Sequence, residues 1–328
     1  MSKTNLKNPS DRKAYIITGP TSGIGRATAL ELAKLGTVVL VGWDCRKLNE
    51  LQGIIEQKAQ QAVSVVCDLS DPASVRSAAA EIVALHLPIV GLLNNAGIMQ
   101  THATKNALDW DMTFATNHLG PFALTEVLVP HLPDGANVAS AVENPERQPA
   151  KAVGFCGARY ISAEASARGE WQPGGSKMPG ADAYATSKQC NLATVMVFAR
   201  ETPRLHFNAV EPGVNLTTGL GQRGANAFAR FLSKYIIPLL VPLFMPFMKF
   251  LSTSKRAARA HQSPDRCIRS DRCLLRRARP SNARLRARTR SEVYGSRRCR
   301  DTRLTVEDSK MNGVQAHHQP NRKDHKYV

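Results

Sequence analysis

Apolar and polar positions over most of this 328-residue chain follow two alternating patterns. Short runs of mainly apolar residues predict six strands, at residues 13–19, 37–43, 62–70, 87–97, 136–142 and 205–213. Between them, apolar residues spaced three or four positions apart predict helices over 20–36, 46–61, 71–86 (capped by Asp71), 123–132 and 183–201. Strands that read as continuous apolar runs are typical of a parallel sheet covered by helices on both faces. The pattern therefore predicts an α/β fold with a doubly wound parallel sheet.

The turn after the first predicted strand is rich in glycine. The segment TGPTSGIG carries Gly19, Gly23 and Gly25 and leads directly into the first predicted helix. In a parallel sheet this turn is where the phosphates of a dinucleotide bind, because glycine lets the backbone approach them and the N–H groups of a helix N-terminus attract anions. The glycines alone also suit a tight turn without a ligand. Their position after the first strand is what favours cofactor binding.

A second candidate lies in the segment AYATSKQC, where Tyr184 and Lys188 are four positions apart. In a helix the two side chains lie on one face, one turn from each other. A lysine ammonium beside a phenol favours the phenolate and lowers the pKa of the tyrosine, which can then exchange a proton with a reacting oxygen. The pair alone is also compatible with a half-buried tyrosine and an exposed lysine on an ordinary amphipathic helix.

Three motifs, taken in order, resemble those of the short-chain dehydrogenase/reductase family. They are the glycine pattern G-x-x-x-G-x-G, the segment NNAG at 94–97 and the Y-x-x-x-K pair, and the resemblance extends over about residues 13–253. It implies a Rossmann fold, an NAD(P)(H) cofactor and an enzyme that transfers a hydride between the nicotinamide and a carbonyl or alcohol. It also implies that Tyr184 is the general acid or base, and that Lys188 lowers its pKa and binds the nicotinamide ribose.

The resemblance implies roles for further residues at matching positions. Ser140 in NVASAV matches the serine that polarises the substrate oxygen, and Asn117 in FATNHLG matches the helix asparagine that holds a water on the proton relay. His118 lies on another face of that helix and is expected to be structural. The cofactor contacts implied by the resemblance are Gly19, Ser22, Gly23, Ile24, Gly25, Trp43, Asp68, Leu69, Asn94, Asn95, Ala96, Gly97, Tyr184, Lys188, Pro212, Gly213 and Thr217.

The residues after the second predicted strand leave the choice between NADH and NADPH open. NADP-preferring relatives usually carry arginine where Trp43 stands, and NAD-preferring relatives usually carry aspartate near Gly42. Trp43 can stack on an adenine but offers no charge to a 2′-phosphate. Arg26 and Arg46 are candidate substitutes, whereas Asp44 would repel the phosphate if it faced it.

The distance between Ser140 and Tyr184 is 44 positions, longer than in compact members of the family. The additional segment, 141–180, is rich in glycine, proline and small polar residues and connects two elements of the predicted site. Such long loops are often lids or binding loops, and a surface embellishment is an equal alternative. An insertion at this place resembles the branch that holds retinol dehydrogenases and protochlorophyllide reductases.

The segment FLSKYIIPLLVPLFMPFMKFL, residues 231–251, lies within 214–253, where the family has its substrate-binding lobe. Residues 236–248 are uncharged and apolar, but they are too few to span a bilayer and contain three prolines that would interrupt a helix. We expect an apolar substrate lobe and, as a second interpretation, contact with a membrane surface. Both interpretations predict a lipophilic small-molecule substrate.

The formal net charge of +18 is unevenly distributed. Residues 255–328 hold 21 Lys and Arg against 7 Asp and Glu, whereas residues 1–254 are close to neutral. The chain thus divides into an oxidoreductase domain, 1–254, without the basic footprint of a specific nucleic-acid binder, and an Arg-rich tail. We interpret the tail as a nucleic-acid arm that binds phosphates without sequence specificity, as an ordinary solvated tail or, preferably, as out-of-frame sequence. The family's last helix and seventh strand are therefore expected to be missing.

Seven cysteines without a C-x-x-C pair or a Cys/His metal spacing favour a reduced, cytoplasmic setting and predict no metal site. The polar start, MSKTNLKNPSDRK, lacks the apolar core of a signal peptide. A homodimer is compatible with the family. The alternative function is that of a non-catalytic Rossmann-fold protein, either an inactive scaffold or a nucleic-acid binder that uses the basic tail.

Overall fold

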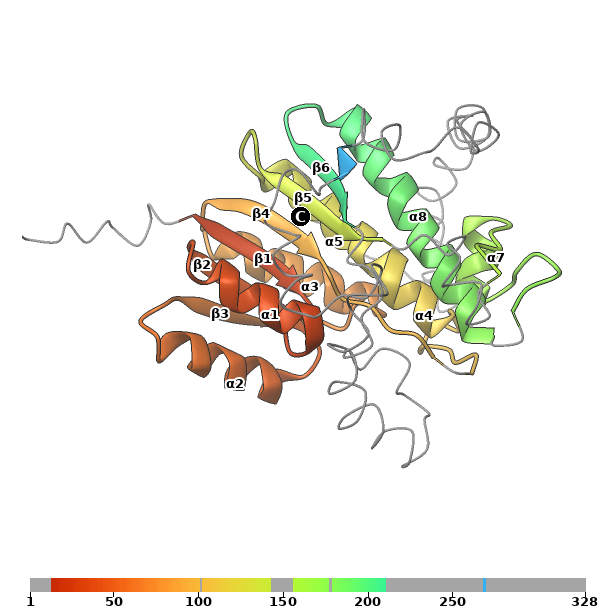
Figure 1. Cartoon of the computed structure of the whole chain (residues 1–328), viewed down its shortest axis with the longest axis horizontal. Coiled ribbons are helices and arrows are strands. Elements are labelled where there is room, and N and C mark those ends of the chain that lie inside the picture. The colour runs from red at the N-terminus through yellow and green to blue at the C-terminus, as the bar shows by residue number, and fades with distance from the viewer. Residues whose placement is uncertain (1–12, 101, 143–155, 177–178, 211–267, 270–328) are drawn as a thin grey trace, which may run out of the picture.

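The computed structural model describes residues 13–100, 102–142, 156–176, 179–210 and 268–269. These residues form one seven-stranded sheet with the order β3-β2-β1-β4-β5-β6-β7 (Figure 1). The strands are β1 (Ala14–Thr18), β2 (Thr37–Gly42), β3 (Ala62–Val66), β4 (Ile89–Asn94), β5 (Asn137–Ala141), β6 (His206–Val210) and β7 (Ile268–Arg269). β1 to β6 pair in parallel. Because the chain adds β2 and β3 on one side of β1 and β4 to β6 on the other, the sheet is doubly wound, which confirms the predicted fold class.

Helices cover both faces of this sheet (Figure 1). They are α1 (Gly23–Leu32), α2 (Cys45–Glu56), α3 (Pro72–Ala84), α4 (Met112–Phe114), the π-helical segment η2 (Ala115–Leu119), α5 (Gly120–Leu128), the 3-10 turn η3 (Val129–His131), α7 (Ala163–Arg168) and α8 (Pro179–Glu201). One buried cluster joins α1 and α2 to Ile17, Val38 and Leu40. A second joins α3, α5 and α8 to the opposite face, which Ile16 and Val39 occupy. Since consecutive strand residues point to opposite faces, burial of both faces explains the continuous apolar runs.

Two aspartates cap the N-termini of α2 and α3. The side chain of Asp71 accepts a hydrogen bond from the N–H of Ala73 at 2.9 Å, and Pro72 occupies the first helical position of α3, where it has no N–H to lose. This confirms the cap predicted from the sequence. Asp44 caps α2 in the same way, accepting from the N–H of Lys47 at 3.1 Å.

The helix predicted over 123–132 begins earlier than the pattern indicated, and this part of the prediction was wrong. α4, η2 and α5 follow one another without a break over 112–128, and the side chain of Asp111 caps their N-terminus. The pattern failed here because Gly120 and Pro121 normally interrupt a helix, yet they stand at the start of α5, directly after the π-helical turn. α7 was not predicted, because its six residues are too few to show a helical period.

The described residues extend the parallel sheet by one short antiparallel strand and contain no seventh parallel strand. β7 comes from the Arg-rich tail and pairs antiparallel with β6, with Ile268 opposite Ala209 and Arg269 opposite Asn208. Two residues are too few to produce an apolar pattern, so the sequence could not reveal this strand. The rest of the tail and the segment 214–253 lie outside the described residues, and the division into two domains stays a prediction.

Candidate functional site

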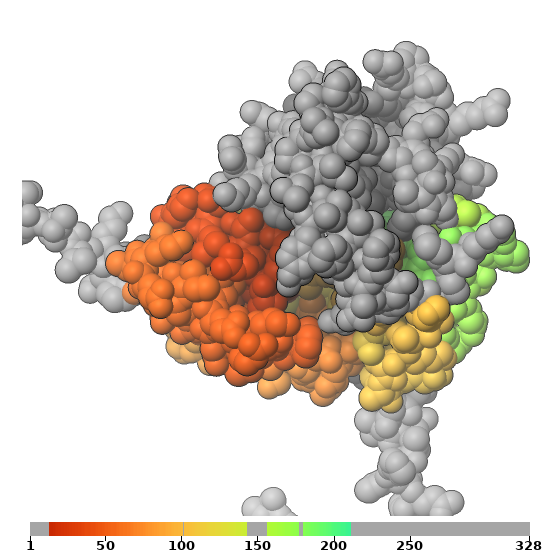
Figure 2. All heavy atoms as spheres, turned by 60° about the horizontal axis from the view of Figure 1, so that its bottom comes forward, coloured from red at the N-terminus to blue at the C-terminus, as the bar shows by residue number. Residues whose placement is uncertain are grey.

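The predicted site residues lie where the carboxyl ends of β1, β4 and β5 are adjacent. The strand order places β1 beside β4, at the point where the chain changes direction in the sheet. Ligands of doubly wound sheets bind beyond the carboxyl ends of the strands at this switch point. In the space-filling view, the N-terminal β-α units and the region of α4 and α7 form the two sides of the described surface (Figure 2). The site is thus built from both halves of the domain.

The turn between β1 and α1 is closed by backbone packing. Gly19 has a φ of 64°, and a Cβ atom at this position would lie 2.9 Å from the Cα of Ala96. A Cβ atom on Gly25 would collide with the carbonyl oxygen of Gly19 and with the side-chain nitrogen of Asn95. Gly23, at the start of α1, also has a positive φ, of 52°. The turn therefore requires glycine both for its conformation and for the close approach of β4.

A threonine that the sequence patterns did not single out ties this turn to β4. The hydroxyl of Thr18 accepts hydrogen bonds from the N–H groups of Asn95 and Ala96, both at 3.0 Å. The side-chain amide of Asn95 donates in return to the carbonyl oxygens of Thr18 at 2.9 Å and Gly19 at 3.2 Å. The available signal was a polar residue at the end of a mainly apolar strand, because a buried hydroxyl needs partners.

The N-terminus of α1 fits an anionic group. Ser22 stands at the N-cap position, but in the described part of the chain its side chain makes no capping hydrogen bond, and the first turn holds no acidic residue. The first N–H groups of a helix have no partner within the helix, and its dipole favours negative charge at this end. Together with the open backbone of the glycine turn, Ser22, Gly23, Ile24 and Gly25 are suited to hold the pyrophosphate of a dinucleotide.

Tyr184 and Lys188 lie on one face of α8, as their spacing predicted, and both are buried, with 7% and 5% of their surface exposed. The Lys188 ammonium lies 5.5 Å from the centre of the Tyr184 ring. It donates a hydrogen bond at 3.1 Å to the carbonyl oxygen of Ala141, the last residue of β5. It also faces Gly97, where an added Cβ atom would lie 3.5 Å from the ammonium nitrogen. The alternative of an exposed lysine on an ordinary amphipathic helix therefore does not hold.

Asn117 lies in η2 and is fully buried. Its Oδ1 accepts a hydrogen bond from the N–H of Ile98 at 2.8 Å, and its Nδ2 donates to the carbonyl oxygen of Ile98 at 2.8 Å and to the hydroxyl of Ser187 at 3.2 Å. An added Cβ atom on Gly97 would lie 3.6 Å from Oδ1. The structure thus brings Asn117 and Lys188 together at the loop that follows β4.

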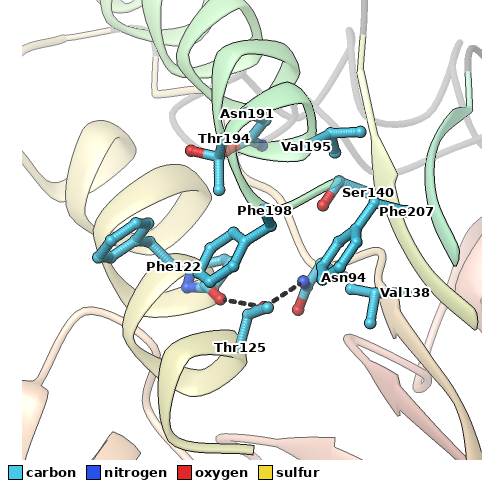
Figure 3. A pocket seen from close by; sticks show the side chains of 11 residues that line it. Asn94, Phe122, Thr125, Val138, Ser140, Asn191, Thr194, Val195, Phe198 and Phe207 are labelled. Atoms are coloured by element: carbon cyan, nitrogen blue, oxygen red, sulfur yellow. Dashed lines mark hydrogen bonds between the residues drawn. The ribbon is translucent and has the colours of Figure 1, made fainter. Parts of the chain in front are cut away.

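Ser140 lies on β5 opposite Asn94 of β4, and its side chain is buried. It points to the face covered by α5 and α8 and lines a small cavity there (Figure 3). Asn94 lines the same cavity and donates a hydrogen bond to the hydroxyl of Thr125 on α5 at 2.8 Å. Because neighbouring residues point in opposite directions, Asn94 faces α5 while Asn95 reaches the glycine turn. The side chain of Asn94 is thus engaged on the α5 face, and its predicted contact with the cofactor would come from the backbone.

The residues predicted to contact the adenosine lie at the ends of β2 and β3. Trp43 is 61% exposed, and the Lys47 ammonium lies 5.9 Å from its ring centre. Asp68 is exposed, and its carboxylate accepts hydrogen bonds from the N–H and the hydroxyl of Ser70 at 2.8 and 2.7 Å. The side chain of Leu69 is buried in the core. At Leu69, a ligand contact would therefore come from the backbone.

The described part of the insertion is held against the helices of the site. The N–H of Arg159 donates to the hydroxyl of Thr186 on α8 at 2.9 Å. The rings of Trp171 and Phe114 pack edge to face, with their centres 6.0 Å apart. The insertion thus contacts α8, which carries Tyr184 and Lys188, and α4, which leads into η2 with Asn117. Its function as a lid stays a prediction.

Other predicted features lie outside the described residues. They are Pro212, Gly213 and Thr217 and the segment 231–251. Among the helices that the structure describes, none has the length and apolar character needed to cross a membrane. The described residues also hold no group of three side chains that could bind a metal ion.

Several known dehydrogenases have similar sequences. The family model for short chain dehydrogenase matches residues 13–142. Retinol dehydrogenase 12 of Mus musculus is 31% identical over 265 residues, which cover 77% of this chain and 73% of that protein. Polyprenol dehydrogenase of Mus musculus is 39% identical over 127 residues, 38% of each chain.

Two solved bacterial structures share this fold. A dehydrogenase/reductase from Sinorhizobium meliloti superposes with a TM-score of 0.53 and 22% identity, over 76% of this chain and 86% of that chain. A short chain dehydrogenase from Burkholderia cenocepacia, solved in complex with NADP, gives a TM-score of 0.51 and 22% identity, over 76% and 88% of the two chains. At this identity the two likenesses show the fold, the doubly wound sheet.

Proposed function

This chain belongs to the short-chain dehydrogenase/reductase family and is an NAD(P)-dependent oxidoreductase of alcohols or carbonyl compounds, and we propose that Tyr184 carries out its proton transfer on a lipophilic substrate. The observation that carries this proposal is the buried group of Tyr184, Lys188 and Asn117 beside the loop after β4. The alternative of a non-catalytic Rossmann-fold protein is not favoured, because the similar curated proteins are dehydrogenases.

The cofactor, when bound, supplies or takes up the hydride at its nicotinamide ring. The glycine turn and the N-terminus of α1 would hold its pyrophosphate, since both offer backbone N–H groups without side-chain bulk. Lys188 would bind the nicotinamide ribose, because its ammonium faces Gly97, which has no side chain to block an approach. The backbone of Asn95 and Ala96 is already fixed by Thr18 before any ligand arrives.

In carbonyl reduction, Tyr184 donates its hydroxyl proton to the substrate oxygen, and in alcohol oxidation it takes this proton back. The phenolate formed in between is stabilised by the Lys188 ammonium, 5.5 Å from the ring centre. Both groups are buried, so their attraction is screened less than it would be in water. Ser140 would polarise the substrate oxygen through its hydroxyl.

The contacts of Asn117 constrain how it takes part in a proton relay. Both hydrogens of its Nδ2 are used, on Ile98 and Ser187. A relay water can therefore receive no hydrogen bond from the Asn117 side chain and must donate to one of its oxygen atoms. Such a water would in turn accept a hydrogen bond from Lys188, whose ammonium lies at the same loop.

Two observations support a lipophilic substrate. Retinol dehydrogenase 12 and polyprenol dehydrogenase, both similar to this chain, are named for lipophilic alcohols. The chain itself carries the uncharged apolar run at 236–248. We propose a lipophilic alcohol or the corresponding carbonyl compound as substrate. Contact of 231–251 with a membrane surface, a homodimer and a cytoplasmic location are further proposals.

The choice between NADH and NADPH depends on the cations near Trp43. Arg46 is paired with Glu50 at 2.6 Å and Lys47 with Asp44 at 3.0 Å, so these charges are already engaged. Fluorescence titration of the full-length protein with NADH and with NADPH measures the preference. Tighter binding of NADPH would mean that a cation such as Lys47 leaves its partner for the 2′-phosphate.

The variant Tyr184→Phe tests the proposed mechanism, with retinol and a polyprenol as probe substrates and Tyr15→Phe as a matched control. We expect kcat to fall by about 10³-fold, as is typical for the loss of a general acid or base, while the dissociation constant of the cofactor stays unchanged. Tyr15→Phe also removes a phenol hydroxyl but should keep wild-type kcat. Wild-type activity of Tyr184→Phe would refute the mechanism.

A further inference from the structure

α8 carries polar side chains on the face that it buries. Tyr184, Ser187, Lys188 and Asn191 are spaced i, i+3, i+4 and i+7, so they form one stripe along the helix, and none has more than 7% of its surface exposed. Buried helix faces are normally apolar, and buried polar groups need hydrogen-bond partners. The proposed function uses Tyr184 and Lys188 but assigns nothing to Asn191. The spacing of this stripe is also visible in the sequence, since it places four polar residues on one face of the helix.

Asn191 connects α8 to two consecutive residues of η2. Its Nδ2 donates a hydrogen bond to the backbone carbonyl oxygen of Asn117 at 2.9 Å. Because that oxygen can only accept, the Oδ1 of Asn191 is left to face His118, whose Nδ1 lies 3.0 Å away. His118 must therefore carry its proton on Nδ1 and donate it to Asn191. One asparagine thus uses both ends of its amide on η2 (Figure 3 shows its place beside the cavity).

His118 is a rigid and neutral partner in this contact. Its ring is 1% exposed and lies between Phe114 and Phe122, with ring centres 5.1 and 6.3 Å apart. Burial lowers the pKa of His118 to about 4, so the ring is uncharged at neutral pH. Among the described residues, its Nε2 has no hydrogen-bond partner. A leucine would fill this space without that cost, so the contact through Nδ1 is what distinguishes histidine here.

The π-helical form of η2 makes the direction of Asn117 dependent on outside contacts. The carbonyl oxygen of its N-terminal residue, Ala115, accepts a hydrogen bond from the N–H of Gly120 five positions later, a spacing that is rare and frequently found at functional sites. A return to α-helical spacing would change the direction in which the Asn117 side chain points. Two hydrogen bonds oppose such a change in the middle of η2. Asn191 donates one to the backbone oxygen of Asn117 and accepts the other from His118.

We propose that Asn191 and His118 form a clamp that keeps η2 π-helical and so positions Asn117 beside Lys188. The inference rests on the proposed function, in which Asn117 belongs to the proton relay. Asn191 and His118 are positioning residues, because they act through Asn117. Loss of the clamp slows proton transfer and leaves the binding of substrate and cofactor in place.

The test compares Asn191→Leu, His118→Leu and His118→Asn in the full-length protein with NAD(P)(H) and retinol, with Thr194→Val as the matched control. The two leucine variants should lower kcat by roughly 10- to 100-fold, as a small displacement of a catalytic group does, and increase the solvent deuterium isotope effect on kcat. KM and the dissociation constant of the cofactor should stay within about twofold of wild type.

Two variants separate the clamp from general packing. His118→Asn keeps a donor near the position of Nδ1 and should restore kcat to within about threefold of wild type. Thr194 lines the same cavity one turn further along α8, outside the clamp, so Thr194→Val should keep wild-type kcat (Figure 3).

Several results would overturn the clamp. They are wild-type kcat in Asn191→Leu, equal losses in His118→Leu and His118→Asn, or a rise in KM or in the cofactor's dissociation constant in place of the loss of kcat. Loss of the folded state in all three variants would assign the contact to stability and overturn the proposal too. If Asn191→Leu alone fails to fold, the comparison of kcat between His118→Leu and His118→Asn decides whether the clamp exists.

The failure of the proposed function would look different. In that case Asn117→Ala would keep wild-type kcat, and no clamp variant could act through it. If Asn117→Ala loses activity while Asn191→Leu keeps it, the clamp alone is wrong.

Discussion

The glycine turn between β1 and α1 and the polar stripe of α8 serve one reaction but are built in opposite ways. The turn depends on missing atoms, because a Cβ on Gly19 or Gly25 would meet the backbone of its neighbours. The stripe depends on atoms that are present, since Lys188 and Asn191 donate hydrogen bonds to β5 and to η2. Additions to the turn should therefore impair cofactor binding, whereas deletions from the stripe should impair turnover.

The largest effect is expected from the stripe. Lys188→Met keeps most of the side-chain volume but removes the buried ammonium beside Tyr184, so the phenolate loses its stabilising charge. We expect kcat to fall by about 10³-fold, measured by steady-state formation of NAD(P)H. Lys34→Met, which removes an exposed lysine paired with Glu31, is the control and should keep full activity. Equal activity of the two variants would contradict the assigned role of Lys188.

The turn should respond to an added methyl group. Gly25→Ala places a Cβ against the carbonyl oxygen of Gly19, which must move, and we expect the dissociation constant of the cofactor to rise by about 10- to 100-fold. Gly53→Ala is the matched control, because Gly53 is also helical and has nothing within 4 Å of the added atom. It should leave cofactor binding unchanged and stabilise α2 by about 1 kcal/mol. Isothermal titration and thermal unfolding measure the two quantities.

The pH dependence of stability tests whether the clamp of Asn191 and His118 is buried as described. Burial lowers the pKa of His118 from 6.5 to about 4 in the folded protein. Because the unfolded chain binds this proton more readily, His118 makes the folded state lose stability as the pH falls from about 6.5 to about 4. Relative to His118→Asn, the wild type should lose on the order of 3 kcal/mol over this range. Urea denaturation of both proteins gives the comparison, and parallel pH profiles would contradict it.

The last comparison concerns Thr18, a side chain that ties the turn to β4. Thr18→Val keeps the shape of the side chain but removes the acceptor for the N–H groups of Asn95 and Ala96. We expect a loss of about 2 kcal/mol in the free energy of unfolding. Thr28→Val is the control, because the buried hydroxyl of Thr28 has no partner among the described residues and its removal should not destabilise. Equal unfolding free energies of the two variants would show that the hydroxyl of Thr18 contributes nothing.

Part of the site could be predicted from the sequence because its geometry is local. Gly19 and Gly25 belong to a single turn. Tyr184 and Lys188 share a helix face because residues four positions apart do so in every α-helix. The helix start at Asp111 could not be predicted in this way. Gly120 and Pro121 normally end a helix, and the π-helical turn that accommodates them depends on contacts from α8.

The sequence by itself determined the alternation of strands and helices, the parallel sheet and the side-chain spacing on α8, because these follow from periods of a few residues. The tertiary structure decided which way Asn94 points, that Thr18 holds the end of β4 and that β7 pairs with β6. It also decided the contact of His118 with Asn191, which are 73 positions apart in the chain. Such contacts depend on how helices and strands pack, and no local pattern of residues encodes that packing.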